Sequence, residues 1–138
     1  QGNVKGKTLA LWGLAFKANT DDIRESAAMK TIRILTDEGM IIRAYDPEAG
    51  ANAGDAFADN ELVNIANDQY SILQGADALA VMTDWNQFRN PDFLKIKKIL
   101  NAPIIFDGRN LYSSSYLAGL GFTYFGIGRP ITNISHLQ

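Results

Sequence analysis

The chain has 138 residues, of which 46% are hydrophobic and 20% charged, a composition typical of a single soluble globular domain. Its formal net charge of −2 excludes a global field that would favour nucleic acid or an anionic membrane, so any anion site must be local. There is no cysteine, which excludes disulfides, thiolate metal sites and a cysteine nucleophile within these residues.

The beginning of the chain carries no apolar region of the kind found in signal peptides, and no apolar run reaches the roughly 18 residues of a membrane span. We therefore expect a cytoplasmic protein with no membrane partner. The first strand follows almost at once, and this abrupt start suggests a piece of a longer polypeptide.

Strands and helices are expected to alternate along the chain. Residues 8–13 form a nearly continuous apolar run ending in glycine, which predicts a parallel strand buried on both faces. The next helix is predicted from Asp22 and Glu25, spaced as N-cap and N3 of a capping box, to Gly39 at its C′ position. Further strands are expected at 41–46, 61–65, 76–83, 103–107 and 122–125.

Shorter helical segments are predicted between these strands. Residues 49–60 look irregular, with at most one helical turn; Asp68 caps a brief helix, residues 92–100 form another, and Ser113 or Ser114 caps the last. The tail from Gly126 reads as irregular. The pattern predicts one α/β domain over 1–138: a Rossmann-like, doubly wound, mostly parallel sheet of five to six strands with helices on both faces.

Polar side chains follow the first, fourth and fifth predicted strands, whose carboxyl ends share one edge of such a sheet, where ligands bind. The loop after the first strand is longer than the usual 2–6 residues or so. Lysine and arginine can hold phosphate, and an aromatic ring can stack on a base. The candidate residues are Phe16, Lys17 and Arg24; Thr83, Asp84 and Trp85; and Asp107 and Arg109.

Each candidate also has a purely structural interpretation. Lys17 and Arg24 could pair with the nearby carboxylates in a solvated loop, and Arg109 could pair with Asp107. Trp12, inside an apolar strand, is read as a core residue, whereas for Trp85 a ligand contact and a lid over the sheet edge stay open. We interpret Asp46-Pro47 as a turn and His136 as an exposed tail residue.

Several expected motifs are missing. No G-x-G-x-x-G follows the first strand, there is no P-loop, and no histidine–carboxylate cluster suggests a metal. No activated nucleophile or general base stands out. The sequence therefore predicts a binding surface with neither catalytic nor metal-ligating residues.

Three blocks carry a family resemblance, in order across nearly the whole chain. They are 13–17 with 20–26, then 76–78 leading to 83–85, then 107–110. Together they resemble the C-terminal UDP-binding domain of the UDP-glucose/GDP-mannose dehydrogenase family, typified by UDP-glucose 6-dehydrogenase. Ala18 and Ala27 depart from the proline that many relatives carry there.

The resemblance implies a longer homodimeric or higher oligomeric enzyme that oxidises UDP-glucose to UDP-glucuronate with two NAD. Its NAD-binding domain, helical central region and catalytic cysteine are absent from this chain, which we therefore expect to be inactive alone. By the same resemblance, Phe16, Lys17 and Arg109 would bind the nucleotide sugar, with UDP-glucose the first choice, and Arg24 would reach towards NAD.

Two other kinds of function stay open. One is the same domain of a GDP-mannose or UDP-N-acetylmannosamine dehydrogenase. The other is a non-catalytic nucleotide-sensing or receiver-like domain. A receiver needs an acid pair directly after the first strand, whereas Asp21-Asp22 lies well beyond Gly13, and a lysine after the fifth strand, where this chain has Arg109.

Overall fold

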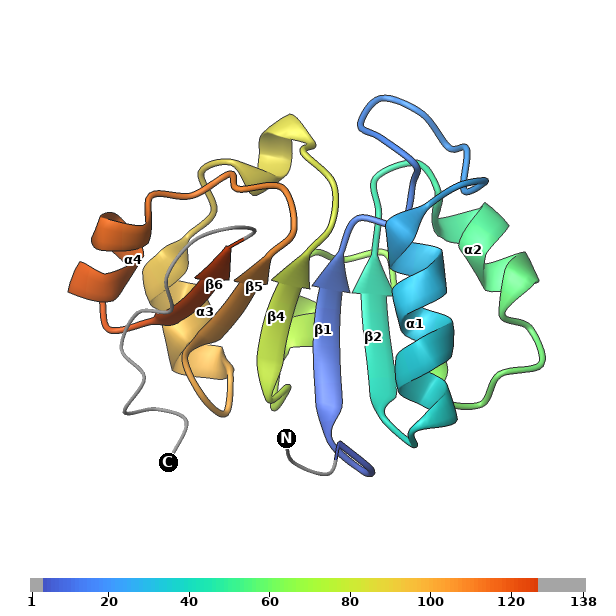
Figure 1. Cartoon of the computed structure of the whole chain (residues 1–138), viewed down its shortest axis with the longest axis horizontal. Coiled ribbons are helices and arrows are strands. Elements are labelled where there is room, and N and C mark those ends of the chain that lie inside the picture. The colour runs from blue at the N-terminus through green and yellow to red at the C-terminus, as the bar shows by residue number, and fades with distance from the viewer. Residues whose placement is uncertain (1–3, 127–138) are drawn as a thin grey trace.

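A six-stranded parallel sheet forms the centre of the molecule in a computed structural model that describes residues 4–126. The strands lie in the order β3-β2-β1-β4-β5-β6. Their bounds are β1 Thr8–Trp12, β2 Ile41–Tyr45, β3 Val63–Ile65, β4 Ala78–Val81, β5 Ile104–Asp107 and β6 Thr123–Gly126 (Figure 1). The predicted α/β class, the strand count and the parallel arrangement are all confirmed.

The two middle strands are the most apolar and the most buried. Every residue of β1 and of β4 is buried, because these central strands pack against a hydrophobic cluster on each face of the sheet. The outermost strand β3 is partly exposed along its length. The short apolar runs in the sequence thus correspond to the central strands.

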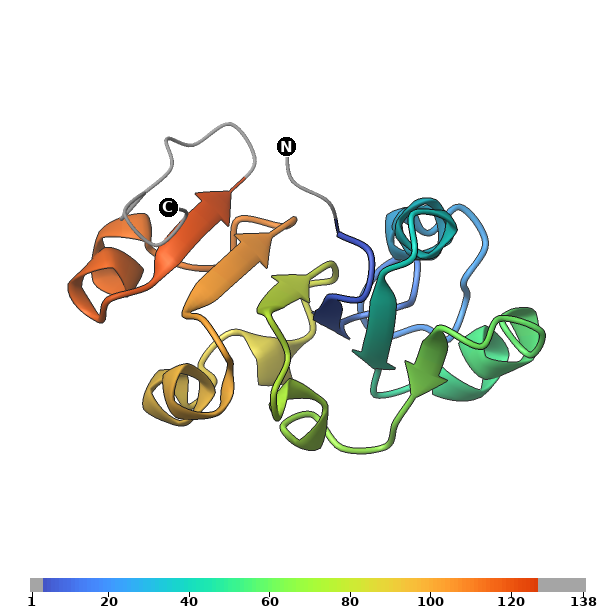
Figure 2. The ribbon, with the colours of Figure 1, turned by 90° about the horizontal axis from the view of Figure 1, so that it is seen from below.

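Helices cover both faces of the sheet, and Figure 2 shows α1 and α3 on opposite sides of it. Helices α1 (Ala27–Asp37) and α2 (Gly50–Ala56) pack in one hydrophobic cluster, with Leu9 and Leu11 of β1. Helices α3 (Phe93–Ile99) and α4 (Ser114–Gly119) pack in the other, with Ala10 and Trp12. The alternation along β1 therefore divides the core into two layers, as a doubly wound fold requires.

The start of α1 differs from its prediction. Glu25 has φ 62°, which is incompatible with the N3 position of a capping box, and the Asp22 carboxylate accepts from Arg24 instead. Ser26 is the N-cap, since its Oγ accepts from Met29 N at 3.3 Å. The predicted end is confirmed: Gly39, with φ 90°, directly follows the C-cap Glu38.

The shorter elements agree with the sequence in most places. Ser113 caps α4 with its side chain as expected, and Asp92, the first residue of the predicted helix, is the N-cap of α3. Residues 49–60 contain the seven-residue helix α2 rather than a single turn, and Asp68 accepts from Ser71 N at a 3₁₀ turn, Ser71–Leu73. Strand β6 includes Gly126, where the irregular tail was expected to begin; residues 127–138, with His136, lie outside the described residues.

Candidate functional site

The loops that carry the predicted site residues leave the sheet at the carboxyl ends of β1, β4 and β5. We call this side of the sheet the carboxyl edge; it is the upper edge in Figure 1, where the loops over 13–26 and 82–92 rise above the arrowheads. Ligands of open α/β sheets bind at this edge. The structure therefore places all the candidates on the side of the sheet that the sequence predicted.

Backbone hydrogen bonds hold the loop over 13–26 at its start and across its middle. Gly13 N donates to Tyr45 O at 2.8 Å, and Phe16 N donates to Asp22 O at 2.7 Å. Asn19 (φ 64°) and Glu25 (φ 62°) have left-handed backbone conformations. Such conformations in non-glycine residues gather at binding loops, where the surrounding structure enforces them.

Asp46, at the end of β2, is the centre of the hydrogen-bond network below this loop. Its Oδ2 accepts from Leu14 N at 2.7 Å, from Ala15 N at 3.1 Å and from Trp85 Nε1 at 3.3 Å. Its Oδ1 accepts from the backbone N–H groups of Glu48 and Ala49, both at 2.8 Å. The bond to Glu48 N is that of an Asx turn, which confirms the turn predicted at Asp46-Pro47.

Asp107, at the end of β5, plays a similar part on the other side. Its carboxylate is 2% exposed and accepts from Arg109 N at 3.0 Å, Tyr112 N at 3.0 Å and Tyr124 Oη at 2.8 Å. Burial, with the charge of Asp107 close by, raises the pKa of Tyr112 far above its usual range. Asp107 thus orders the loop of Arg109 through the backbone of Arg109.

The three candidate cations are presented in different ways. The Arg24 guanidinium forms a bidentate ion pair with Asp22, with Nε–Oδ1 at 3.0 Å and Nη2–Oδ2 at 2.9 Å. These hydrogen bonds lower the pKa of the Asp22 carboxyl to about 2. Lys17 and Arg109 are exposed, and within residues 4–126 neither side chain has an ion pair. The structural interpretation therefore holds for Arg24 and fails for Lys17. Arg109 does pair with Asp107, as a turn residue, but through its backbone N–H and not through its guanidinium.

The aromatic residues divide in the same manner. Trp12 is fully buried, stacks on Phe88 and donates its indole N–H to Gln69 O, which confirms it as a core residue. Trp85 is 8% exposed and its indole N–H points to Asp46, so it closes the sheet edge. Phe16 is 46% exposed, with Lys17 Nζ 5.9 Å from its ring centroid, and is the aromatic side chain of loop 13–26 that a ligand can reach.

Shallow pockets lie along the whole of loop 13–26. One of about 270 Å³ is lined by Phe16, Asp22, Arg24 and Glu25, and another of about 500 Å³ reaches Glu48 and Trp85. Two more, of about 510 Å³ and 260 Å³, extend from Arg24 towards α2 and along α1. Arg109 lines none of these four. The structure therefore brings Phe16 and Arg24 to one hollow but leaves Arg109 on the separate loop after β5.

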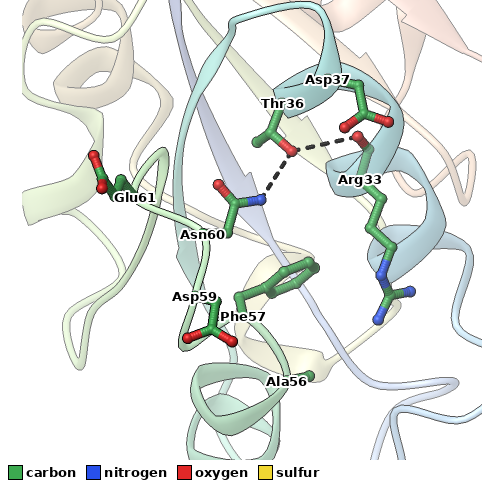
Figure 3. Close-up of a pocket in the computed structure, with 8 residues that line it drawn as sticks. All are labelled: Arg33, Thr36, Asp37, Ala56, Phe57, Asp59, Asn60 and Glu61. Atoms are coloured by element: carbon green, nitrogen blue, oxygen red, sulfur yellow. Dashed lines mark hydrogen bonds between the residues drawn. The ribbon is translucent and has the colours of Figure 1, made fainter.

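A larger hollow of about 590 Å³ lies away from the carboxyl edge, between the second half of α1 and the segment after α2 (Figure 3). Two of its polar side chains bond to each other, because Asn60 Nδ2 donates to Thr36 Oγ1 at 3.0 Å. The Arg33 guanidinium lies over the Phe57 ring, 5.2 Å from its centroid. Volume alone does not make it the functional site, since none of the candidate residues lines it.

Two features at the carboxyl edge were not foreseen from the sequence. One is the use of Asp46 as a hydrogen-bond centre. The other is a close approach of Gly13 to Thr83: the Thr83 hydroxyl is fully buried, has no hydrogen-bond partner in the described part of the chain, and leaves no room for a side chain at Gly13. The glycine at the end of the first strand was the available signal for the second.

Over the described residues, no helix is long and apolar enough to cross a membrane. The same residues contain no group of three or more histidine, aspartate or glutamate side chains that could hold a metal ion.

Comparison with known proteins agrees with this fold. Residues 10–114 match the UDP binding domain of the UDP-glucose/GDP-mannose dehydrogenase family. The chain is 47% identical over 135 residues to UDP-glucose 6-dehydrogenase of Pseudomonas aeruginosa, covering 94% of this chain and 29% of that protein. It is 40% identical over 129 residues to the enzyme of the same name from Rhizobium meliloti, again over 94% of this chain and 29% of the relative.

Among solved structures, UDP-D-ManNAc dehydrogenase from Pyrococcus horikoshii superimposes with a TM-score of 0.73 at 30% identity, over 92% of this chain and 27% of that one. The chain thus spans less than a third of the length of the relatives it matches. From the family match and the shared fold, this chain belongs to the UDP-glucose/GDP-mannose dehydrogenase family and corresponds to its UDP binding domain.

Proposed function

We propose that this chain binds the nucleotide part of a UDP-sugar, UDP-glucose in the first place, at the carboxyl edge beside loop 13–26. The observation that carries the proposal is the pair of exposed cations, Lys17 and Arg109, on loops that the buried carboxylates of Asp46 and Asp107 order from below. Neither cation must leave an ion pair within the described residues before it meets a phosphate.

Each proposed contact follows from how its side chain is exposed. Phe16 offers a flat apolar face, and Lys17 beside it offers a point charge, a combination suited to a base or sugar next to a phosphate. Arg109 would hold the diphosphate from the loop after β5. Phe16, Lys17 and Arg109 are therefore the proposed substrate-binding residues.

Arg24 is the proposed contact with the cofactor. Asp22 engages Nε and Nη2 of its guanidinium, yet the side chain is 86% exposed, so the remaining donors face outwards. An anionic cofactor such as NAD, held mainly by another domain, could approach these donors. Arg24 would then bridge the two parts of the enzyme.

For the whole protein we propose the activity of the relatives named UDP-glucose 6-dehydrogenase, an NAD-dependent oxidation of UDP-glucose to UDP-glucuronate in an oligomeric enzyme. These 138 residues would be its C-terminal domain, with the NAD-binding and central helical domains elsewhere. The chain has no cysteine to form a covalent intermediate. We therefore expect no NADH when this chain is mixed with NAD and UDP-glucose; measurable turnover would contradict this assignment of roles.

Calorimetric titration with UDP, UDP-glucose, GDP and GDP-mannose tests the binding proposal. Uridine ligands should bind, and Lys17→Ala or Arg109→Ala should weaken binding roughly tenfold, since losing a charge-assisted hydrogen bond removes at least about 1.4 kcal/mol. Lys98→Ala is the matched control: Lys98 is exposed at the far end of α3 and should have no effect. Equal affinity of Lys17→Ala and the control would refute the proposed site.

The same titration, extended to UDP-N-acetylmannosamine, separates the second candidate, a UDP-N-acetylmannosamine or GDP-mannose dehydrogenase. The likeness in fold to UDP-D-ManNAc dehydrogenase favours considering it. Tighter binding of UDP-N-acetylmannosamine than of UDP-glucose, or a preference for guanosine ligands, would replace the first choice of sugar or of base.

A further inference from the structure

The carboxylate of Asp46 connects three segments of the carboxyl edge. It accepts from the backbone of Leu14 and Ala15 after β1, from the backbone at the start of α2, and from the Trp85 indole after β4. Asp46 is only 6% exposed. One buried group thus ties together loops that are distant in sequence.

Both oxygens of this carboxylate face N–H donors alone. Within the described residues no lysine, arginine or histidine lies close enough to form an ion pair with Asp46, so N–H groups stabilise the buried charge. An asparagine would have an NH2 group in place of one carboxylate oxygen. In either orientation of the amide, this NH2 group would face two or three N–H donors, which it cannot accept from. The site therefore requires a carboxylate at this position.

The loop that Asp46 holds is the one that carries Phe16 and Lys17. The two side chains are exposed and lie beside each other. Their positions therefore depend on the backbone that comes before them. That backbone is anchored by the bonds of Leu14 N and Ala15 N to Asp46 and by the Ser26 hydroxyl, which donates to Leu14 O at 2.8 Å. Asp46 supplies two of these three bonds to side chains, which add to the backbone bonds of Gly13 N to Tyr45 O and Phe16 N to Asp22 O.

In dinucleotide-binding folds an acid at the end of the second strand hydrogen-bonds the ligand's ribose. Here the same position faces inward, and its acceptor capacity is used by the protein. We infer that Asp46 is a positioning residue, which holds loop 13–26 in the conformation that presents Phe16 and Lys17 to the nucleotide sugar without touching the ligand. This inference rests on the proposed function for its ligand.

Asp46→Asn, studied by NMR and calorimetry on the 138-residue chain, tests the inference. The chain has two tryptophans, and only the Trp85 indole donates to Asp46, whereas the Trp12 indole donates to Gln69 O. The Trp85 indole signal should move and that of Trp12 should stay. Hydrogen exchange at Leu14, Ala15 and Phe16 should speed up at least about tenfold, with UDP-glucose affinity falling by a similar factor.

Asp77→Asn provides the matched control. Asp77 is also an aspartate whose Oδ2 accepts a backbone N–H, from Thr8 at 2.8 Å, but it lies at the opposite edge of the sheet, before β4. Its substitution should lower stability and leave both loop exchange and affinity unchanged. A loss of affinity in Asp77→Asn equal to that in Asp46→Asn would show a general effect of destabilisation and overturn the inference.

If Asp46→Asn does not fold, the wild-type chain still tests whether Asp46 touches the ligand. When UDP-glucose is added, the NMR signals of the Phe16 and Lys17 amides should change their chemical shift, whereas that of the Asp46 side-chain carboxyl carbon should not. A shift of that carbon as large as theirs would mean that Asp46 touches the ligand, which overturns the inference. If the wild-type chain binds no nucleotide, the proposed function fails, and unchanged loop exchange in Asp46→Asn would separately refute the positioning role.

Discussion

Replacing Gly13 by alanine should be among the most damaging single changes at the carboxyl edge. Gly13 has φ 99°, and a Cβ added there would lie 2.2 Å from Thr83 Oγ1 and 2.8 Å from Thr83 N. The second contact is with backbone, which a change of rotamer cannot relieve. Strand β4 or the loop after β1 must therefore move.

The cost has two parts. Holding an L-residue in the left-handed region costs about 1–2 kcal/mol, and overpacking a closely packed site costs about 1–3 kcal/mol. Together they predict a loss of about 2–5 kcal/mol from a total stability on the order of 5–15 kcal/mol. For a domain of this size that corresponds to a fall in Tm of roughly 8–20 °C.

Urea and thermal unfolding of Gly13→Ala and Gly75→Ala separate the backbone cost from the overpacking cost. Gly75 also has positive φ, 73°, but a Cβ there would meet nothing within 4 Å, so its substitution reports the backbone cost alone, about 1–2 kcal/mol. If Gly13→Ala unfolds no more easily than Gly75→Ala, the close approach of Gly13 to Thr83 does not limit stability and the reasoning is refuted.

Three further predictions concern the groups that order the loops. Tyr124→Phe removes the hydroxyl donor to buried Asp107 and should lower the free energy of unfolding by about 1.5–3 kcal/mol in urea titrations; no change would mean that the backbone donors suffice. Ser26→Ala should cost about 1–2 kcal/mol through loss of the α1 cap, with faster amide exchange in the first turn of α1 as the check. The pKa of Asp22, about 2 beside Arg24, should return towards 3.8 in Arg24→Ala when its carboxyl carbon is titrated by NMR. The pKa of the Asp22 carboxyl is lower in the folded chain than in the unfolded one. The pair with Arg24 therefore stabilises the fold at pH values above the unfolded pKa, and this stabilisation is lost as pH falls from about 4 towards 2.

The fold could be predicted from the sequence because its signals are local. The apolar runs of β1 and β4 and the glycine after α1 are read within a few residues of one another. The start of α1 could not be predicted in the same way. Asp22 and Glu25 have the spacing of a capping box, but the loop forces Glu25 into a left-handed conformation, and Ser26 takes the cap.

The location of the candidate site residues could be predicted from the sequence, but the hydrogen bonds that connect their loops could not. The spacing placed Phe16, Lys17 and Arg109 on one edge, and the structure agrees. Three partners of Asp46, which are Leu14, Ala15 and Trp85, lie 31 to 39 residues away from it, beyond the reach of any local pattern. A purely local interpretation accounts for its turn and misses the loops that it joins.

These connections also explain how a chain with net charge −2 could offer the anion site that we propose. The acids at the strand ends, Asp46 and Asp107, are turned inward, where N–H donors from the loops stabilise their charge. The same bonds order the loops on whose outer side Lys17 and Arg109 are exposed. A phosphate can thus reach these two cations without breaking an ion pair within the described residues, whereas at Arg24 it must share the guanidinium with Asp22. This difference favours Lys17 and Arg109 as the groups that bind the nucleotide, and Arg24 as the group that meets a ligand held chiefly by another domain.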